Sequence, residues 1–125
     1  LHTTGAARTI DRVIDVFPPN SKEYIRIQLA SNLIAVISQA LCKKKGAGRV
    51  AAFEIMIRTD AIGALIRDNK TFRILSEIQT GGKLGMITLD SSLVNLYKNG
   101  LISESEVLLH AQNPLEIRRE LLAES

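Results

Sequence analysis

The first apolar residues of the chain recur at the spacing of a helix. Their period of three to four residues predicts a helix over residues 4–17, with the charged residues between them facing water. Two prolines follow directly and should end this helix, because proline lacks an N–H group and restricts the residue before it. The expected buried face consists of Ile10, Val13, Ile14 and Phe17.

A second, longer helix is expected after the prolines, where Asn20 can cap the first turn and Glu23 can act as its reciprocal partner. Apolar residues continue at helical spacing as far as Leu41, and the three lysines and the glycine that follow suit the end of a helix. A second interpretation is that residues 39–44 are extended and form a hairpin with the next segment. The apolar face of the helix would consist of Ile25, Leu29, Leu33, Val36, Ile37 and Leu41.

The period changes to two over residues 49–57, which predicts a strand. Both sets of alternate positions are largely apolar, so we expect both faces of this strand to be covered. After Thr59, the capping residues and apolar periods predict short helices over residues 60–69, 71–80, 89–99 and 103–112, and a last one that begins at Pro114. The expected fold class is therefore α/β and predominantly α, with helices and a strand or hairpin over residues 1–58 and a small helical subdomain over residues 59–125.

Composition narrows the possible functions. Hydrophobic residues make up 46% of the chain and charged residues 23%, a balance typical of a folded domain. No apolar run reaches the roughly 18 residues of a membrane-spanning helix. A net charge of +3 that is mostly interleaved with acids, three Phe, two Tyr and no Trp do not favour nucleic acid as a partner. The single cysteine, Cys42, allows no internal disulfide and no cysteine-based zinc site, so we expect no metal centre and a reducing compartment.

Candidate chemistry is sparse. A phosphate-binding loop of the form G-x-x-x-x-G-K-[ST] is absent, and Gly81-Gly82-Lys83 is better interpreted as the end of a helix. His2 precedes the first expected helix, whose N–H groups and positive end can approach an anion. On sequence grounds alone, however, a lone histidine is more often a surface or core residue. Lys43–Lys45 could bind a phosphate or could simply end a helix, and His110 is expected to be structural.

Several motifs in a fixed order resemble one known family. They are LHT at residues 1–3 with Ala6 and Ala7, TIDRVIDVFP at 9–18, VISQAL at 36–41, GRVAAFEIM at 48–56, AIGALIRD at 61–68, IQTG at 78–81 and GMITLD at 85–90. Together they resemble the C-terminal part of PilT-type type IV pilus retraction ATPases, which belong to the secretion ATPases. The likeness begins at the His box of that family. The chain has no initiator Met and opens in the middle of this motif, so we expect it to be part of a longer protein.

The resemblance implies a hexameric, ATP-hydrolysing motor with a RecA-like nucleotide domain. ATP and Mg²⁺ would be bound mainly by Walker motifs that precede Leu1, so this chain alone should be inactive. His2 would be the catalytic residue that senses the γ-phosphate, and Thr3, Lys43 and Arg49 would lie near the nucleotide. The motor would be a homo-hexamer at the cytoplasmic face of the inner membrane, acting on a pilus platform protein. The motif proposed to transmit motion or to form a subunit surface comprises Ala61, Ile62, Leu65, Ile66, Arg67 and Asp68.

Two departures from the family pattern and two rival functions stay open. Gly63 and Ala64 stand where the family motif has Arg and Asn, which puts contacts made by those side chains in doubt, and Asp68 stands where it has Glu. A pilus-assembly or type II secretion ATPase would share the chemistry, but those relatives commonly carry a four-cysteine insertion that this chain lacks between Leu41 and Arg49. A helical interaction module without catalysis is the other alternative. Separated from its strand neighbours, the chain could also dimerise through the strand over residues 49–57.

Overall fold

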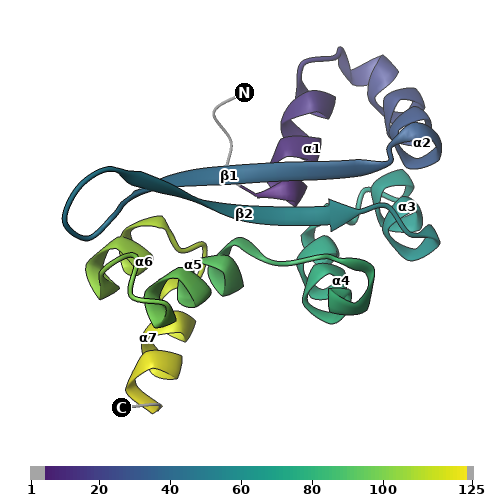
Figure 1. Ribbon diagram of the computed structural model, residues 1–125. Helices are drawn as coiled ribbons and strands as arrows, with labels where there is room; N and C mark the ends of the chain where they lie inside the picture. The colour runs from purple at the N-terminus through teal and green to yellow at the C-terminus, as the bar shows by residue number, and fades with distance from the viewer. Residues whose placement is uncertain (1–4, 124–125) are drawn as a thin grey trace.

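The computed structural model describes residues 5–123 and shows a two-stranded antiparallel hairpin with short helices packed against it. Figure 1 shows α5, α6 and α7 beside the half of the hairpin nearest its loop, and α1 to α4 around its middle and its other end. This arrangement confirms a mostly helical α/β chain. The elements are α1 (Ala6–Asp15), η1 (Pro19–Ser21), α2 (Lys22–Asn32), β1 (Ala35–Lys43), β2 (Arg49–Ile57), α3 (Asp60–Arg67), η2 (Thr71–Arg73), α4 (Ile74–Thr80), η3 (Gly82–Leu84), α5 (Leu89–Lys98), α6 (Glu104–His110) and α7 (Pro114–Ala123).

The hairpin has a continuous register in which Ala35 pairs with Ile57 and Lys43 pairs with Arg49. The strand predicted over residues 49–57 is confirmed with the same bounds. The second edge of β2 is also occupied, because Ile55 and Ile87 exchange two backbone hydrogen bonds of 2.9 and 3.2 Å. Among the described residues, β1 has no strand on its outer edge.

The prediction of one helix from Asn20 to Leu41 is wrong. The helix ends at Asn32 and the chain continues as β1, a longer version of the hairpin that was the second interpretation. The apolar spacing fits both periods here, but the backbone groups of β2 need hydrogen-bond partners, and an extended β1 supplies them. Val36 and Ile37 consequently point to opposite faces of the hairpin instead of sharing a helix face.

The hairpin is covered on one face, which corrects the expectation that both faces of residues 49–57 are buried. The outward face exposes 67% of Ile37, 52% of Leu41 and 40% of Phe53. The buried face alternates with it along both strands and consists of Ser38, Ala40, Cys42, Ala52, Glu54 and Met56.

Most of the later helices form where their capping residues predict. The hydroxyl of Thr59 accepts a hydrogen bond from the N–H of Ile62 (3.2 Å), and that of Ser103 accepts one from Glu106 (3.2 Å). The expected Asn20 cap is wrong, because Asn20 lies within η1 and the N-cap position of α2 is Ser21, which makes no side-chain cap. The first helix is also shorter than residues 4–17 and ends at Asp15, while Phe17 is 37% exposed.

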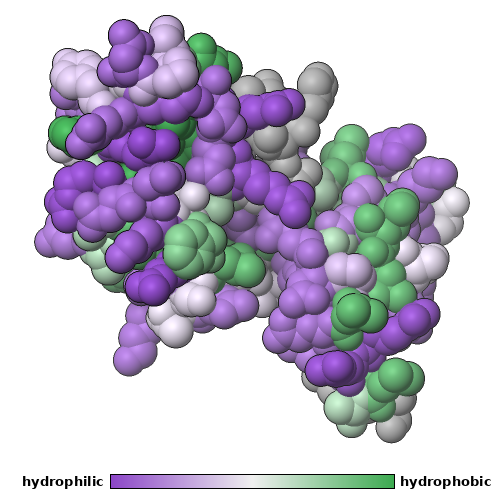
Figure 2. All heavy atoms as spheres, turned by 180° about the vertical axis from the view of Figure 1, so that it is seen from behind, coloured by the Kyte–Doolittle hydropathy of each residue, from purple (hydrophilic) through white to green (hydrophobic). Residues whose placement is uncertain are grey.

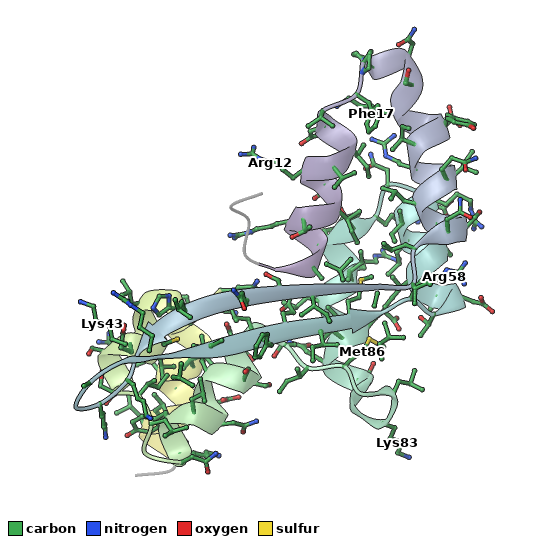
Figure 3. All side chains as sticks on the ribbon, turned by 45° about the horizontal axis from the view of Figure 1, so that its top comes forward. Arg12, Phe17, Lys43, Arg58, Lys83 and Met86 are labelled. Atoms are coloured by element: carbon green, nitrogen blue, oxygen red, sulfur yellow. The ribbon has the colours of Figure 1, made fainter. Side chains whose placement is uncertain are left out.

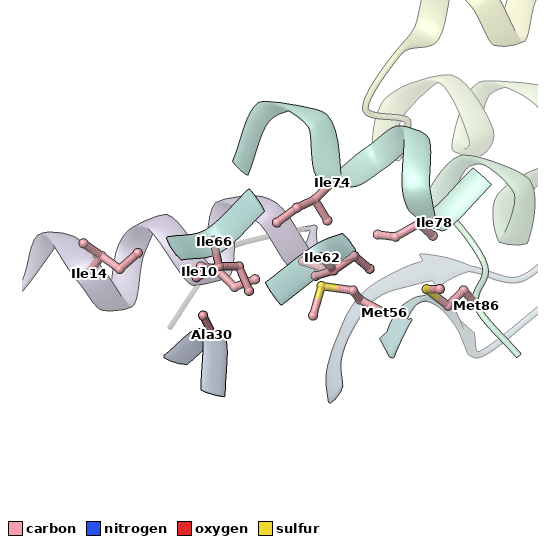
Figure 4. Close-up of a cluster of buried hydrophobic side chains, with 10 residues drawn as sticks. Ile10, Ile14, Ala30, Met56, Ile62, Ile66, Ile74, Ile78 and Met86 are labelled. Atoms are coloured by element: carbon pink, nitrogen blue, oxygen red, sulfur yellow. The ribbon is translucent and has the colours of Figure 1, made fainter. Parts of the chain in front are cut away.

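Two hydrophobic clusters lie along the buried face of the hairpin. The first, drawn in Figure 4, joins α1, α2, α3 and α4 to the end of β2 around Met56. The second joins α5, α6 and α7 to the other half of the hairpin around Cys42 and Ala52. Each cluster draws residues from both sides of position 58, and the predicted division into residues 1–58 and 59–125 stays a prediction.

The surface of the molecule differs between its two ends. Figure 2, seen from behind, shows hydrophobic side chains gathered on the lobe at the right, which holds the hairpin loop and α5 to α7, whereas hydrophilic side chains cover most of the other lobe. The large exposed apolar residues of α6 and α7 are Leu109, Leu115 and Leu122. Within residues 5–123, no helix is both long and apolar enough to cross a bilayer.

Cys42 provides a test of the β1 assignment. It is fully buried, and burial together with the nearby Glu106 carboxylate raises the pKa of its thiol. Because the thiolate is the reactive form, DTNB should label Cys42 slowly in native buffer and completely in urea, as followed by the absorbance of the released thiolate. The matched control is Ile37→Cys in a Cys42→Ser background, which places the thiol on the exposed face and should react at once. Equal rates for the two thiols in native buffer would contradict the strand.

Candidate functional site

The segment that follows His2 is fixed against the buried face of the hairpin. His2 and Thr3 themselves lie outside the described residues. Gly5 adopts a φ of +104° and donates its N–H to the hydroxyl oxygen of Ser38 at 2.8 Å. A Cβ at Gly5 would collide only with the end of the flexible Gln112 side chain, so it is the positive φ that favours glycine at this position. The residues next to the predicted phosphate sensor therefore have a defined anchor.

Glu54 receives the next backbone donor and connects it to a distant helix. Its Oε2 accepts the N–H of Ala6 at 2.6 Å, and its Oε1 accepts the N–H of Leu89 at 3.1 Å. Ala6 and Leu89 are the first residues of α1 and α5, whose N–H groups have no partner within their own helices. The side chain is 1% exposed, and none of the ion pairs within residues 5–123 includes it. Two helix N-termini thus take the place of a cation.

Lys43 and Arg49 lie at the loop end of the hairpin, opposite each other in register. Lys43 lies five positions along the strand from Ser38, which places it about 17 Å from the anchor of Gly5. Figure 3 shows Lys43 near the loop and Arg58 at the opposite end. The three lysines end a strand instead of a helix, and the backbone N–H of Lys43 donates to Glu106 at 2.7 Å. The structure does not bring Lys43 and Arg49 beside Gly5, and their proximity to nucleotide stays a prediction.

The predicted motor motif forms α3 and the residue after it. Ile62 and Ile66 are fully buried in the first cluster and Leu65 packs against it, so these three side chains fix the helix. Ala61, Arg67 and Asp68 are exposed, and Arg67 pairs with Asp68 at 3.3 Å between half-exposed side chains. A pair this exposed contributes little stability, so both groups stay available to another surface.

Gly63 leaves space for the side chain of Arg58, a role that the sequence motif did not indicate. A Cβ at this position would lie 2.7 Å from Nη2 of Arg58 and 3.0 Å from its Cζ. The Arg58 guanidinium uses that space to donate from Nε to the carbonyl of Ala30 (2.8 Å) and from Nη1 to Asp60 (3.0 Å). Arg58 thereby fastens the end of α2 to the start of α3. Where the family motif has an arginine at the position of Gly63, the guanidinium beside α3 comes here from Arg58, the residue after β2.

Comparison with known proteins gives a consistent result, although no protein-family model matches the sequence. The chain is 55% identical over 114 residues to the type IV pilus retraction ATPase PilT of Pseudomonas aeruginosa, covering 91% of this chain and 33% of PilT. It is 51% identical over 114 residues to a twitching motility protein of Neisseria gonorrhoeae, covering 90% and 30%. The crystal structure of the pilus retraction motor PilT with bound ADP superposes with a TM-score of 0.83 at 40% identity, over 95% of this chain and 33% of that one.

These likenesses in sequence and fold match the chain to about a third of a PilT-type pilus retraction ATPase. The chain spans about a third of the length of the relatives it matches.

Three residues of the site were missed by sequence reasoning: Ser38, Glu54 and Arg58. Glu54 carried a usable signal, because it is the one acid among the alternate positions of an otherwise apolar strand face. A carboxylate at such a position must find donors inside the fold. Ser38 and Arg58 carried no such signal, since the first was assigned to a helix and the second is the residue directly after the strand.

The contact between Gly63 and Arg58 can be tested by a double-mutant cycle. In an open helix position Gly→Ala stabilises by about 1 kcal/mol, but here the new Cβ displaces a guanidinium whose hydrogen bonds are worth a similar amount. Gly63→Ala should therefore leave the unfolding free energy nearly unchanged in the wild type and raise it by about 1 kcal/mol in an Arg58→Ala background. Urea titration measures both values. The exposed position Ala61 is the control, and Ala61→Gly should cost the same in both backgrounds. Equal effects of Gly63→Ala in the two backgrounds would contradict the contact.

Proposed function

We propose that this chain is the C-terminal part of a hexameric, ATP-hydrolysing motor that retracts type IV pili and so drives twitching motility. The observation that carries the proposal is 55% identity over 114 residues to a pilus retraction ATPase, supported by a matching fold. In this assignment residues 1–58 complete a RecA-like ATPase domain and residues 59–125 form a helical subdomain. The absence of a four-cysteine insertion supports retraction over assembly or type II secretion.

His2 is proposed to sense the γ-phosphate. The support from the structure is the anchoring of Gly5 and Ala6 at the start of α1, where the positive end of a helix dipole would favour a nearby anion. The matched PilT structure contains ADP, and we propose ATP with Mg²⁺ as the substrate here. Most of the ligands for ATP and Mg²⁺ would come from outside this chain, whose 125 residues contain no P-loop motif. Catalysis would then consist mainly of positioning and charge stabilisation, with Thr3, Lys43 and Arg49 as further candidates near the nucleotide.

The outward face of the hairpin is proposed to contact the rest of the longer protein. It exposes Ile37, Leu41 and Phe53 in one layer, and the adjoining edge of β1 has no strand beside it among the described residues. Exposed apolar surface beside an open strand edge is a site for strand addition. In the isolated 125-residue chain the same edge favours a dimer.

The exposed part of the α3 motif, Ala61, Arg67 and Asp68, is proposed as a contact within the ring, held in position by Ile62, Leu65 and Ile66. The proposed partners are further copies of the same protein and an inner-membrane pilus platform protein, with the motor at the cytoplasmic face of that membrane. Nucleic acid is not proposed as a partner, because the net charge is only +3 and few aromatic side chains are present.

The experiment uses the longer protein that contains this chain. It should hydrolyse ATP and restore twitching to a strain that lacks its own retraction ATPase, with pili still visible on the surface. His2→Ala should reduce ATP turnover by about 100-fold, because a hydrogen bond to a developing phosphate charge is lost while the fold is kept. Turnover is measured as phosphate release and folding by circular dichroism.

The matched control is the other histidine of the chain. His110 pairs with Glu106 at 3.5 Å within α6. His110→Ala should keep both turnover and twitching. Wild-type turnover in His2→Ala would remove the sensor role, and loss of surface pili in a strain deleted for the gene would assign the motor to assembly.

A further inference from the structure

Glu54 lies where the two hydrophobic clusters meet. On the side toward the hairpin loop, the buried residues Ala40, Cys42 and Ala52 belong to the second cluster. On the other side, the buried residue Met56 belongs to the first cluster. Ser38 and Glu54 lie between them and are paired in register. Both are buried, at 6% and 1% exposure. The hairpin therefore has a polar layer between two apolar ones.

The hydrogen bonds of this layer lead from one end of the chain to the other. Ser38 holds Gly5, and Glu54 holds Ala6 with one oxygen and Leu89 with the other. From α5 the path continues through Asp90, whose two carboxylate oxygens accept the N–H groups of Gln112 and Asn113 at 2.7 and 2.9 Å, directly before α7. One carboxylate thus joins the segment after His2 to the helices of the second cluster.

The two hydrogen bonds to Ala6 and Leu89 require a carboxylate on a side chain as long as that of glutamate. Glu54 must accept a hydrogen bond on each of its two oxygens, while a glutamine has one accepting oxygen and would turn an NH₂ group toward one of the two N–H donors. An aspartate has both oxygens but is shorter by one methylene. Glu54 is only 1% exposed, so the loss of an acceptor here is costly.

We propose that Glu54 is a positioning residue that transmits displacement of the segment carrying His2 to α5 and, through Asp90, to α7. The inference rests on the proposed role of His2 for its use in the motor. A shift of Gly5 and Ala6 displaces Oε2 of Glu54. Because the carboxylate is a rigid planar group, Oε1 moves as well and displaces the N–H of Leu89. Glu54 thus couples the segment after His2 to α5, and Asp90 extends the connection to the residues before α7.

Amide hydrogen exchange of the 125-residue chain, followed by NMR, tests the coupling without nucleotide. Ser38→Ala removes the acceptor of Gly5 alone and does not touch α5. Exchange should become about tenfold faster at Gly5 and Ala6 and also at Leu89, because the disturbance passes through Glu54. In a Glu54→Gln background, Ser38→Ala should add nothing at Leu89.

The matched control is Glu106→Gln, which also removes a carboxylate that accepts a backbone N–H, that of Lys43, but one that does not face residues 5 and 6. It should leave the response of Leu89 to Ser38→Ala intact. The proposal is overturned if Ser38→Ala leaves Leu89 unchanged, or if Glu106→Gln abolishes the response as Glu54→Gln does. Should Glu54→Gln fail to fold, the Leu89 response in Ser38→Ala alone decides the matter.

The longer protein supplies a kinetic readout that a purely structural role would not affect. Glu54→Gln should lower kcat about tenfold and change the KM for ATP by less than about twofold, because nucleotide is bound elsewhere and only the transmitted movement is impaired. An unchanged kcat would reject the transmission. Failure of the unmodified longer protein to hydrolyse ATP would instead reject the proposed function.

Discussion

The two hydrogen bonds of the Glu54 carboxylate are the constraint on which the rest of the structure depends. A buried carboxylate without donors is costly, and each missing partner would cost on the order of 1–3 kcal/mol. The two donors come from the first turns of α1 and α5, so these helices must begin against the middle of the hairpin. The starting points of α1 and α5 are thereby fixed beside the hairpin. One polar residue on an apolar strand face thus orients two halves of the molecule.

The helices could not hold these positions by themselves. α4 and α6 have 7 residues each and α3 has 8, lengths at which an isolated helix is not stable in water. Their stability comes from side chains that reach the hairpin or one another, such as Ile62 and Ile66 in the first cluster and Val107 in the second. The hairpin is in turn protected by them on one face only. The uncovered face, with Ile37, Leu41 and Phe53, fits a chain that is about a third of the length of its relatives.

The elements governed by local chemistry could be predicted from the sequence. Thr59 and Ser103 cap helices with their own hydroxyls, and the period of two over residues 49–57 needs no distant partner to be recognised. The segment 33–43 could not be assigned in this way, because its apolar residues fit both periods and the choice depends on the edge of β2. For the site, the resemblance predicted roles for His2 and for the α3 motif, and these roles stay predictions. Glu54 is recognisable as an acid on an apolar strand face, but its partners, like those of Ser38 and Arg58, lie 28 to 48 positions away and no local pattern identifies them.

The most direct test of this account asks whether the polar layer joins the two clusters into one unit. Urea unfolding followed by NMR can observe the methyl signal of Met56 in the first cluster and those of Val107 in the second within one sample. The account predicts a single midpoint for both signals in the wild-type chain, and separate midpoints once Glu54 is replaced by glutamine. Two different midpoints in the wild type, or one shared midpoint in both proteins, would contradict the claim that Glu54 holds the halves together.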